Sequence, residues 1–410
     1  MRSLAVLSLH TSPLAQPGTG DGGGMNVYVR ALTSALARAG VDCDVYTRAD
    51  GPGLAPVVRV EPGLRVHHLP AGPPEAVPKE ELPGLIPAFT AGVLADQRAS
   101  DHPADAVHAN YWLSGVAGHA IKHELGLPLL STFHTLARVK ADAGLWEGEA
   151  AVRAEAEAAV IGCSDAVLAS CAVEAIQLEA LYGADPARLE IVPLGVETAF
   201  FSPGDRAQAR RAAGLPRGVP LLACVGRIQP LKGFDVAIRA LGLLEDRVPD
   251  AHLVIIGGPS GPEGEAEAQR LRTLVQAFGL KDRVHMLAPQ PHELLSTFYR
   301  AADLVLVPSR SESFGLVALE AGACGTPVVA SAVGGLTTLV DDGVTGFLVE
   351  TRDATAFAGA AAAILGDPML AAAMGDAAAR RATRYTWPAT AARLRRLAID
   401  LTSRELVDCT

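Results

Sequence analysis

Two carboxylates and two cations in the second half of the chain are the residue types that bind a sugar carried on a diphosphate. Glu312 and Glu320 stand eight positions apart in "ESFGLVALE", and Arg227 and Lys232 stand five apart in "RIQPLK". A guanidinium can bind phosphate oxygens through two parallel hydrogen bonds, and a lysine ammonium adds a mobile point charge. Carboxylates accept hydrogen bonds from hydroxyl groups. The pattern therefore predicts that one glutamate meets a sugar hydroxyl and the other a ribose, beside a diphosphate.

A glycine-rich stretch, "GTGDGGGMNVYVR" over residues 18–30, precedes an amphipathic helical pattern. A helix that starts near Gly24 would offer unpaired N–H groups and a positive dipole end to an anion. Gly18, Gly20 and Gly23 formally match the dinucleotide-binding pattern G-x-G-x-x-G, but "HTSPLAQP" separates them from the preceding strand, which that fingerprint does not allow. The stretch thus predicts an anion site, with a flexible glycine loop as the alternative.

The elements that must position these groups follow an alternating pattern in both halves of the chain. Apolar runs such as "LAVLSL" and "AVHAN" in the first half, and "AHLVIIGG" and "DLVLVPS" in the second, are separated by helical stretches. Such runs are typical of strands buried on both faces of a parallel sheet. Ligands bind beyond the carboxyl ends of these strands. We therefore expect an α/β protein with two Rossmann-like domains that face each other across a ligand cleft.

The length of 410 residues also favours two domains, because single cores stop growing below that size. Pro203 and Gly204 interrupt the pattern. We therefore expect an N-terminal domain over 1–202, a C-terminal domain over 203–385, and a final helix over 386–410. One alternative is that this final helix packs back on the N-terminal domain.

Composition limits the partners and the compartment. The formal net charge of −10 argues against nucleic acid, whose phosphates require a basic face. The first residues, "SLAVLSLH", are too short an apolar run for a signal peptide or a membrane span. The six cysteines show no C-x-x-C spacing, which predicts neither a zinc site nor a disulfide framework. These features favour the reducing cytoplasm.

The glycine-rich loop, the Arg–Lys pair and the glutamate pair resemble those of retaining GT-B glycosyltransferases, which use nucleotide sugars. The stretches "HTSPLAQPGTGDGGGMNVYV", "KEELP", "YWLSG", "HTLARVK" and "VGRIQPLKG" resemble, more narrowly, the transferases that act on inositol 3-phosphate in the first step of mycothiol biosynthesis. The resemblance covers essentially the whole chain. It implies a GT-B fold and transfer of N-acetylglucosamine from UDP-N-acetylglucosamine to 1D-myo-inositol 3-phosphate, with retention of the anomeric configuration.

The same resemblance implies roles for individual residues. The implied catalytic residues are His134, Arg227, Lys232 and Glu312. The implied donor-binding residues are Gln16, Pro17, Gly24, Arg227, Lys232, Gln290, Glu312, Phe314, Gly315, Leu316 and Glu320. The implied acceptor-binding residues are His10, Asp21, Gly22, Gly23, Gly24, Met25, Asn26, Lys79, Tyr111, Thr135 and Arg153. A non-catalytic Mg²⁺ site is implied at Tyr299, Arg300, Ala302 and Thr326, and no cofactor is expected for the chemistry itself.

Some positions depart from the family pattern or have simpler explanations. Gln290 stands where the family more often has Arg, and Ser131 where it often has His. His134 could equally be a core histidine bonded to backbone. Arg153 could simply pair with Glu149 or Glu157 one helical turn away.

Other functions remain open from the sequence. The donor could be UDP-glucose, and the acceptor could be an aminocyclitol or a sugar phosphate such as fructose 6-phosphate. A two-domain sugar-binding protein is an alternative of a different class, although a simple binder would not need two cations for a diphosphate. A homodimer is also compatible with the sequence.

Overall fold

The computed structural model describes residues 1–145 and 150–409, and these form two compact α/β units. The first unit comprises Met1–Ala15, Met25–Gly195 and Trp387–Thr410, and the second comprises Gln16–Gly24 and Val196–Thr386. These limits differ from the expected ones. The chain passes from one unit to the other at 195/196 rather than 202/203, and the segment 16–24 groups with the second unit although it lies near the N-terminus.

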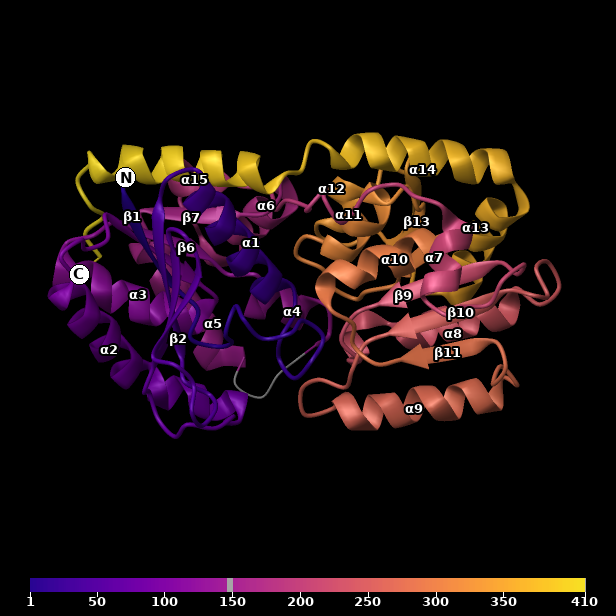
Figure 1. The fold of residues 1–410 in the computed structure, drawn as a ribbon, viewed down its shortest axis with the longest axis horizontal. Coiled ribbons are helices and arrows are strands. Elements are labelled where there is room, and N and C mark those ends of the chain that lie inside the picture. The colour runs from indigo at the N-terminus through magenta and orange to yellow at the C-terminus, as the bar shows by residue number, and fades with distance from the viewer. Residues whose placement is uncertain (146–149, 410) are drawn as a thin grey trace. The chain divides into compact units, whose positions relative to one another are not determined.

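The first unit is built on an eight-stranded sheet with the strand order β3-β4-β2-β1-β5-β6-β7-β8 (Figure 1). All neighbours run parallel except β3 and β4. The strands are β1 (Ser3–Leu7), β2 (Asp42–Arg48), β3 (Val57–Glu61), β4 (Leu64–Leu69), β5 (Ala106–Asn110), β6 (Leu129–Thr132), β7 (Ala166–Ala169) and β8 (Leu189–Ile191). The helices are α1 (Gly24–Arg38), η1 (Lys79–Leu85), α2 (Ile86–Ala99), α3 (Trp112–Leu125), α4 (Ala137–Asp142), α5 (Ala150–Cys163), α6 (Ala172–Tyr182), η2 (Pro186–Arg188) and α15 (Trp387–Thr402).

The second unit is built on a six-stranded parallel sheet with the order β11-β10-β9-β12-β13-β14. The strands are β9 (Leu221–Val225), β10 (His252–Ile256), β11 (Val284–Leu287), β12 (Leu304–Val307), β13 (Val328–Ser331) and β14 (Gly346–Val349). The helices are α7 (Arg206–Ala212), η3 (Pro230–Lys232), α8 (Phe234–Leu243), α9 (Gly264–Ala277), η4 (His292–Leu294), α10 (Leu295–Ala301), α11 (Leu316–Ala323), α12 (Leu336–Leu339), α13 (Ala354–Gly366) and α14 (Pro368–Ala382).

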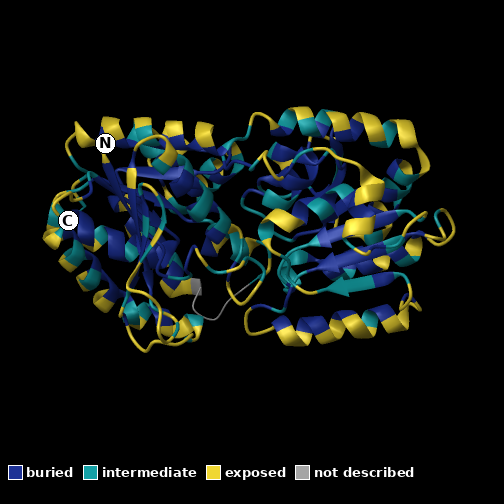
Figure 2. Cartoon of the chain, viewed as in Figure 1, coloured by how far each residue is buried: buried dark blue, intermediate teal, exposed yellow. Residues whose placement is uncertain are grey.

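The hydrophobic pattern explains both sheets. Every residue of β1, "SLAVL", and of β5, "AVHAN", is buried, as expected for central strands with both faces covered. Figure 2 shows the central strands of both sheets in dark blue and the edge strand β11 in teal, while the surrounding helices alternate dark blue with yellow because each buries one face only. The prediction of two Rossmann-like domains is therefore confirmed.

The last helix, α15, packs within the first unit (Figure 1). Its Thr390 Oγ1 donates a hydrogen bond to the Pro193 carbonyl at 2.8 Å, and Arg393 Nη1 donates to the Ile191 carbonyl at 2.6 Å. The Trp387 ring lies edge-on to Tyr28 of α1, with 6.0 Å between ring centroids. The chain therefore returns to its first unit after it has completed the second.

One expectation about the cysteines is wrong. Cys163 and Cys409 lie at disulfide distance, with their Cα atoms 5.1 Å apart, although 246 positions separate them. Spacing motifs detect only pairs that are close in sequence, so no local pattern could reveal this one. The other four cysteines, Cys43, Cys171, Cys224 and Cys324, are buried thiols.

Within the described ranges, no single helix is long and apolar enough to cross a membrane. The pair α13 and α14 passes the length and composition test when taken together, but it is bent by 101° at the break.

Candidate functional site

The second unit places Lys232 and Glu312 on either side of the point where its strand order reverses. Lys232 follows β9 and Glu312 follows β12, the two neighbouring strands from which the sheet extends in opposite directions. This switch point at the carboxyl edge is where open α/β sheets bind ligands. Lys232 Nζ lies 2.7 Å from Glu312 Oε2, and both side chains keep about a fifth of their surface exposed, 21% and 19%. The edge therefore presents an accessible ion pair.

A glycine allows the loops that carry Lys232 and Glu312 to pack closely against each other. Gly233 has φ +68°, and a Cβ at this residue would lie 2.1 Å from the Pro308 carbonyl oxygen. No other residue type fits such a contact without movement of the backbone. A hydrogen bond of 2.9 Å from the Arg310 N–H to the Leu231 carbonyl joins the same two loops. The backbone after β9 is thus held against the backbone after β12.

Arg227, directly after β9, lies beside the glycine-rich segment 16–24. Its Nη1 lies 3.4 Å from both the Asp21 carbonyl and Ser260 Oγ. A Cβ at Gly23 would lie 3.2 Å from Arg227 Nε, so a larger residue would crowd the guanidinium. This contact explains why the segment groups with the second unit and why glycine is present there.

The starts of two helices meet near the same edge. A Cβ at Gly24, the first residue of α1, would lie 3.5 Å from Cδ1 of Leu316, the first residue of α11. Gly315 precedes α11 with φ +103°, a conformation that favours glycine. The predicted donor residues Gly24, Gly315 and Leu316 are therefore brought together, and helix starts offer N–H groups to anions.

Glu320 is held by two hydrogen-bond donors. His292 Nε2 lies 2.6 Å from Glu320 Oε1, and the Tyr299 hydroxyl donates to Oε2 at 2.9 Å. Burial lowers the pKa of His292, but the charge of Glu320 and its hydrogen bond outweigh burial and raise that pKa above its usual value. Burial and Glu320 raise the pKa of Tyr299 well above its usual range. A carboxylate has about four acceptor positions, so Glu320 retains capacity for a ribose hydroxyl.

The remaining predicted donor residues lie in the same unit. Gln16 and Pro17 belong to the segment 16–24. Gln290 follows β11 and donates its side-chain amide to the Ala288 carbonyl at 2.9 Å. Phe314 is buried and its ring lies 6.0 Å from that of Tyr385.

The first unit gathers several predicted acceptor residues at the carboxyl edge of β1, β5 and β6. The rings of His10 and Tyr111 lie 5.0 Å apart. The Arg153 guanidinium lies over the Tyr111 ring at 4.9 Å, and its Nη2 donates to the carbonyl and the hydroxyl of Thr135 at 2.7 and 2.9 Å. Arg153 Nε also pairs with Glu157 Oε1 at 2.8 Å. The expected helical ion pair of Arg153 with Glu157 is therefore present. Arg153 also contacts the predicted acceptor residues Tyr111 and Thr135. The other suggested partner, Glu149, lies outside the described residues.

Two residues at this edge adopt a conformation that side chains usually avoid. Tyr111 has φ 74° and His134 has φ 62°, and no other non-glycine residue of the described ranges has a positive φ. Such conformations cost about 1–3 kcal/mol each and concentrate at functional sites. Tyr111 directly follows β5, and His134 lies two residues after β6, the neighbouring strand.

His134 is neutral at ordinary pH. Burial, followed by the neighbouring His108, lowers the pKa of His134 to about 3. Its Nε2 lies 3.0 Å from Asn110 Oδ1, and its ring meets Tyr28 edge-on at 4.9 Å. The residue is thus bonded to a side chain rather than only to backbone, and it can act as a neutral hydrogen-bonding group but not as a cation.

The rest of the predicted acceptor set is divided between the units. Asn26 is buried on α1 and donates to the Ser12 carbonyl at 2.5 Å, and Met25 precedes it. Lys79 is the first residue of η1 in the first unit. Asp21, Gly22, Gly23 and Gly24 group with the second unit.

The residues suggested for Mg²⁺ lie close together. Tyr299 and Arg300 end α10, Ala302 follows that helix, and Thr326 Oγ1 donates to the Tyr299 carbonyl at 2.8 Å. Carbonyls at a helix C-terminus carry partial negative charge, and oxygen ligands suit Mg²⁺. The four residues provide no carboxylate, so this donor set fits a weakly held structural ion better than a catalytic one.

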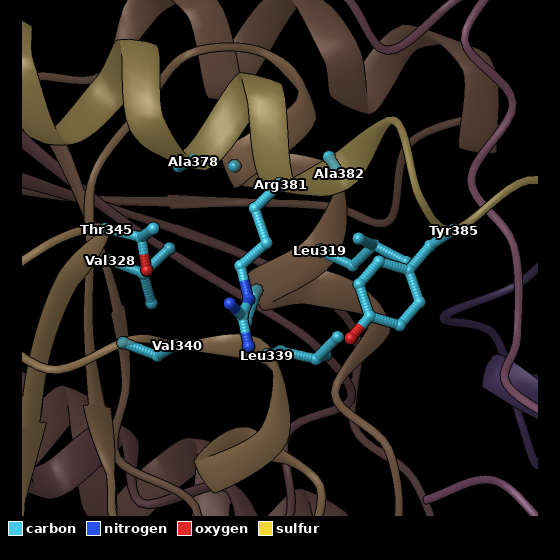
Figure 3. A pocket seen from close by; sticks show the side chains of 11 residues that line it. Leu319, Val328, Leu339, Val340, Thr345, Ala378, Arg381, Ala382 and Tyr385 are labelled. Carbon is cyan, nitrogen blue, oxygen red and sulfur yellow. The ribbon is translucent and has the colours of Figure 1, made fainter.

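A small cavity in the second unit is lined by none of the predicted site residues (Figure 3). Arg381 and Tyr385 extend into it from α14 and the loop that follows, and Arg381 Nη2 donates to the Thr338 carbonyl at 2.6 Å. The lining residues are Ala318, Leu319, Gly322, Val328, Leu339, Val340, Thr345, Ala378, Arg381, Ala382 and Tyr385.

Two groups outside any recognisable motif hold predicted residues in place. His292 orients Glu320, and Ser260 contacts Arg227. Only proximity in the fold identifies these two groups. Glu157, expected as a helical ion-pair partner, holds Arg153 inside the first unit.

Comparison with known proteins agrees with this geometry. Residues 23–195 match the family model described as a glycosyl transferase 4-like domain, and residues 205–381 match the model described as glycosyl transferases group 1. The chain is 48% identical over 397 residues to the D-inositol 3-phosphate glycosyltransferase of Actinosynnema mirum, with 95% of each chain covered. It is also 48% identical over 395 residues to the protein of that name from Mycolicibacterium smegmatis, with 95% of this chain and 89% of the other covered.

One solved structure also resembles this chain over nearly its whole length. The sucrose-phosphate synthase from Thermosynechococcus elongatus superposes with a TM-score of 0.90 at 34% identity, covering 98% of this chain and 99% of the other.

Proposed function

Because the chain belongs to the family of D-inositol 3-phosphate glycosyltransferases, we propose that it transfers N-acetylglucosamine from UDP-N-acetylglucosamine to 1D-myo-inositol 3-phosphate. This reaction is the first step of mycothiol biosynthesis. The observation that carries the proposal is the identity of 48% over 95% of both chains. The accessible Lys232–Glu312 pair at the switch point of the second unit supports it.

We assign the donor diphosphate to Arg227, Lys232 and the helix starts at Gly24 and Leu316. Negative charge grows on the diphosphate as it leaves, and donors that are already in place stabilise that charge in the transition state. Glu312 keeps Lys232 at the edge of the sheet before the donor binds. Glu312 then accepts a hydrogen bond from the transferred sugar, while Glu320, held by His292 and Tyr299, accepts one from the ribose.

We assign the acceptor phosphate to the group around Arg153 in the first unit. Thr135 contributes a hydroxyl, and Tyr111 supports the guanidinium through its ring. Lys79 adds a second cation. The pair between Arg153 and the fully buried Glu157 fixes the guanidinium in one orientation, which lowers the entropy lost when a phosphate binds. His134 contributes a neutral imidazole, which can donate or accept one hydrogen bond without a net charge.

The test of this function is a panel of donors and acceptors, read by the release of UDP and by NMR of the product. We expect UDP-N-acetylglucosamine with 1D-myo-inositol 3-phosphate to give the fastest release, and an α-linked product that retains the donor configuration. Donor without acceptor is the control for hydrolysis. A β-linked product would contradict retention, and no release of UDP with any acceptor would favour the sugar-binding alternative.

A second candidate is transfer to a sugar phosphate, because the sucrose-phosphate synthase shares the fold at 34% identity. Fructose 6-phosphate therefore belongs in the panel, together with UDP-glucose as the alternative donor. Faster turnover with this pair than with inositol 3-phosphate would replace the first proposal. An aminocyclitol without phosphate tests the remaining alternative.

Three further features are proposals from the family resemblance. Mg²⁺ would bind the carbonyls near Tyr299 and Ala302 with Thr326 and would brace α10 without entering the reaction. We expect MgCl₂ to raise the melting temperature of the wild type but not of Thr326→Val, and turnover to be insensitive to a chelator. The other two proposals are a cytoplasmic location and a homodimer. Sedimentation measures the oligomeric state.

A further inference from the structure

Four metal-ligating side chains meet in the first unit, away from the residues assigned to the reaction. His119 and His123 lie on α3, Cys163 is the last residue of α5, and Cys409 lies in the segment after α15. Their ligand atoms all fall within 4.8 Å of one another. The two histidines are four positions apart, so their side chains lie on the same face of the helix. Three separate elements thus deliver two imidazoles and two sulfurs to one place.

The distances suit a tetrahedral metal ion. His123 Nε2 lies 3.3 Å from Cys163 Sγ and 3.0 Å from Cys409 Sγ, and His119 Nε2 lies 3.8 Å from Cys409 Sγ. In a zinc site with Zn–S of about 2.3 Å and Zn–N of about 2.0–2.1 Å, tetrahedral geometry separates S from N by about 3.6 Å. The three observed separations scatter around this value. The two sulfurs lie closer together than two zinc ligands would, and a small movement of the segment that carries Cys409 would separate them.

An ion pair beside the cluster holds α3 and the segment that carries Cys409 in place, and it adds no net charge. Asp165 accepts hydrogen bonds from Lys122 Nζ at 2.9 Å and from the Val407 N–H at 2.8 Å, which fixes the segment that carries Cys409. Lys122 Nζ also donates to the Cys163 carbonyl at 2.8 Å. The buried Lys122–Asp165 pair is neutral overall. Two thiolates and two neutral imidazoles would cancel the charge of a divalent ion, so the cluster as a whole would also be neutral.

We propose that His119, His123, Cys163 and Cys409 form a structural Zn²⁺ site in the reduced protein. The site would fasten the segment after α15 to α3 and α5. The set of two Cys and two His is one that closed structural zinc sites use, and borderline-soft Zn²⁺ accepts both ligand types. This inference is independent of the proposed transferase function.

The competing explanation is a plain disulfide between Cys163 and Cys409, which lie at bonding distance. A disulfide needs only the two sulfurs. It gives no reason for two imidazoles to point their Nε2 atoms at the same sulfurs, whereas a zinc ion requires both. Zinc content under reducing conditions separates the two explanations.

The experiment measures zinc bound to the full-length protein. The chain is purified without a histidine tag, reduced with a phosphine, mixed with ZnCl₂, passed over a desalting column and analysed for zinc by mass spectrometry. We expect one zinc ion per chain in the wild type. Reduced wild type that retains no zinc would overturn the proposal. So would a Cys163–Cys409 disulfide that persists in protein prepared under reducing conditions.

Variants identify the ligands. Cys409→Ser and the double variant His119→Gln/His123→Gln should each weaken zinc binding by more than about 100-fold in a chelator competition, because loss of outer-shell contacts alone costs 10- to 100-fold. Cys171→Ser and His252→Gln are the matched controls and should bind as the wild type does. Equal binding by all variants would contradict the assignment.

Two further readouts do not depend on measured zinc affinities. Co²⁺ in the reduced wild type should give the visible bands of a tetrahedral site together with thiolate charge-transfer absorption. A chelator should lower the melting temperature of the wild type but not of Cys409→Ser, since a ligand that binds only the folded state stabilises it. Octahedral cobalt spectra, or an equal response to the chelator in both proteins, would contradict the site.

Discussion

The charged residues of the two units are arranged in opposite ways. In the second unit, Lys232 and Glu312 each keep about a fifth of their surface exposed, and they come from loops after two strands at the switch point. In the first unit, Arg153 and Glu157 are buried, with side-chain exposures of 5% and 0%, and both lie on one helix. An exposed pair can exchange partners when a ligand arrives, whereas a buried pair must stay together because an unpaired buried charge is costly.

This contrast indicates different roles for the two sets. The second unit presents partly exposed charges that suit a diphosphate whose charge changes during the reaction. The first unit presents a guanidinium fixed by Glu157, Thr135 and the Tyr111 ring, which suits recognition of a constant phosphate. Removing Arg153 should therefore mainly affect stability, and removing Lys232 or Arg227 should mainly affect turnover.

The largest expected effect is on stability, from Arg153→Ala. Removing this guanidinium leaves Glu157 buried without its cation, and breaking such a pair costs about 3–5 kcal/mol. Unfolding in urea, followed by circular dichroism, measures the loss. Arg98→Ala is the matched control, because Arg98 and Glu124 form an exposed pair worth about 0–1 kcal/mol. The double variant Arg153→Ala/Glu157→Gln should recover part of the loss. Equal losses for Arg153→Ala and Arg98→Ala would contradict the claim that burial makes the Arg153–Glu157 pair costly to break.

Next in size is the effect of Lys232→Ala and of Arg227→Ala on turnover. Each change removes a donor to the departing diphosphate, which typically costs about 10²- to 10³-fold in kcat, with little change in stability. Steady-state release of UDP measures kcat, and Lys281→Ala, an exposed lysine of the same unit, is the control. Turnover close to that of the wild type in both variants would refute the assignment of the diphosphate.

Lys79→Ala should have an effect that depends on the acceptor. A hydrogen bond to a charged group contributes roughly 1.5–3 kcal/mol, so kcat/KM for inositol 3-phosphate should fall by roughly 10- to 100-fold. The reaction with free inositol should not change, because it lacks the phosphate. Comparison of the two acceptors in wild type and variant measures the difference. An equal fall with both acceptors would mean that Lys79 acts on something other than the phosphate.

The smallest effect is the pH dependence of stability from His292. Its pKa is raised above 6.5 in the folded protein by Glu320, so the folded state binds the proton more tightly than the unfolded state does. This contribution is complete below pH 6.5 and is lost as the pH rises through the raised pKa. His292→Gln should therefore be less stable than the wild type in acid, and this difference in stability should narrow in alkali. Thermal melting from acid to alkaline pH measures the difference in stability between the wild type and His292→Gln. A difference that grows as the pH rises would contradict this prediction.

The amino-acid sequence by itself determined the layers of the fold and the edge of the second sheet at which the predicted site residues lie. Short aliphatic runs are typical of strands buried on both faces, and their alternation with helical stretches favours parallel sheets with loops at the carboxyl edge. Arg227, Lys232, Glu312 and Glu320 lie near the ends of such runs, and the local pattern places them at that edge. The confirmed recognition of the family rests on the same local motifs.

Only the tertiary structure decided which distant segments meet. It grouped residues 16–24 with the second unit, returned α15 to the first, and brought Cys163 within reach of Cys409 and the two histidines of α3. It also set His292 against Glu320 and drove the pKa of His134 down to about 3 through burial. Contacts between segments that are remote in sequence leave no periodic pattern, and burial depends on everything packed around a residue. For that reason the motifs could predict candidate reacting groups but not the partners that hold them.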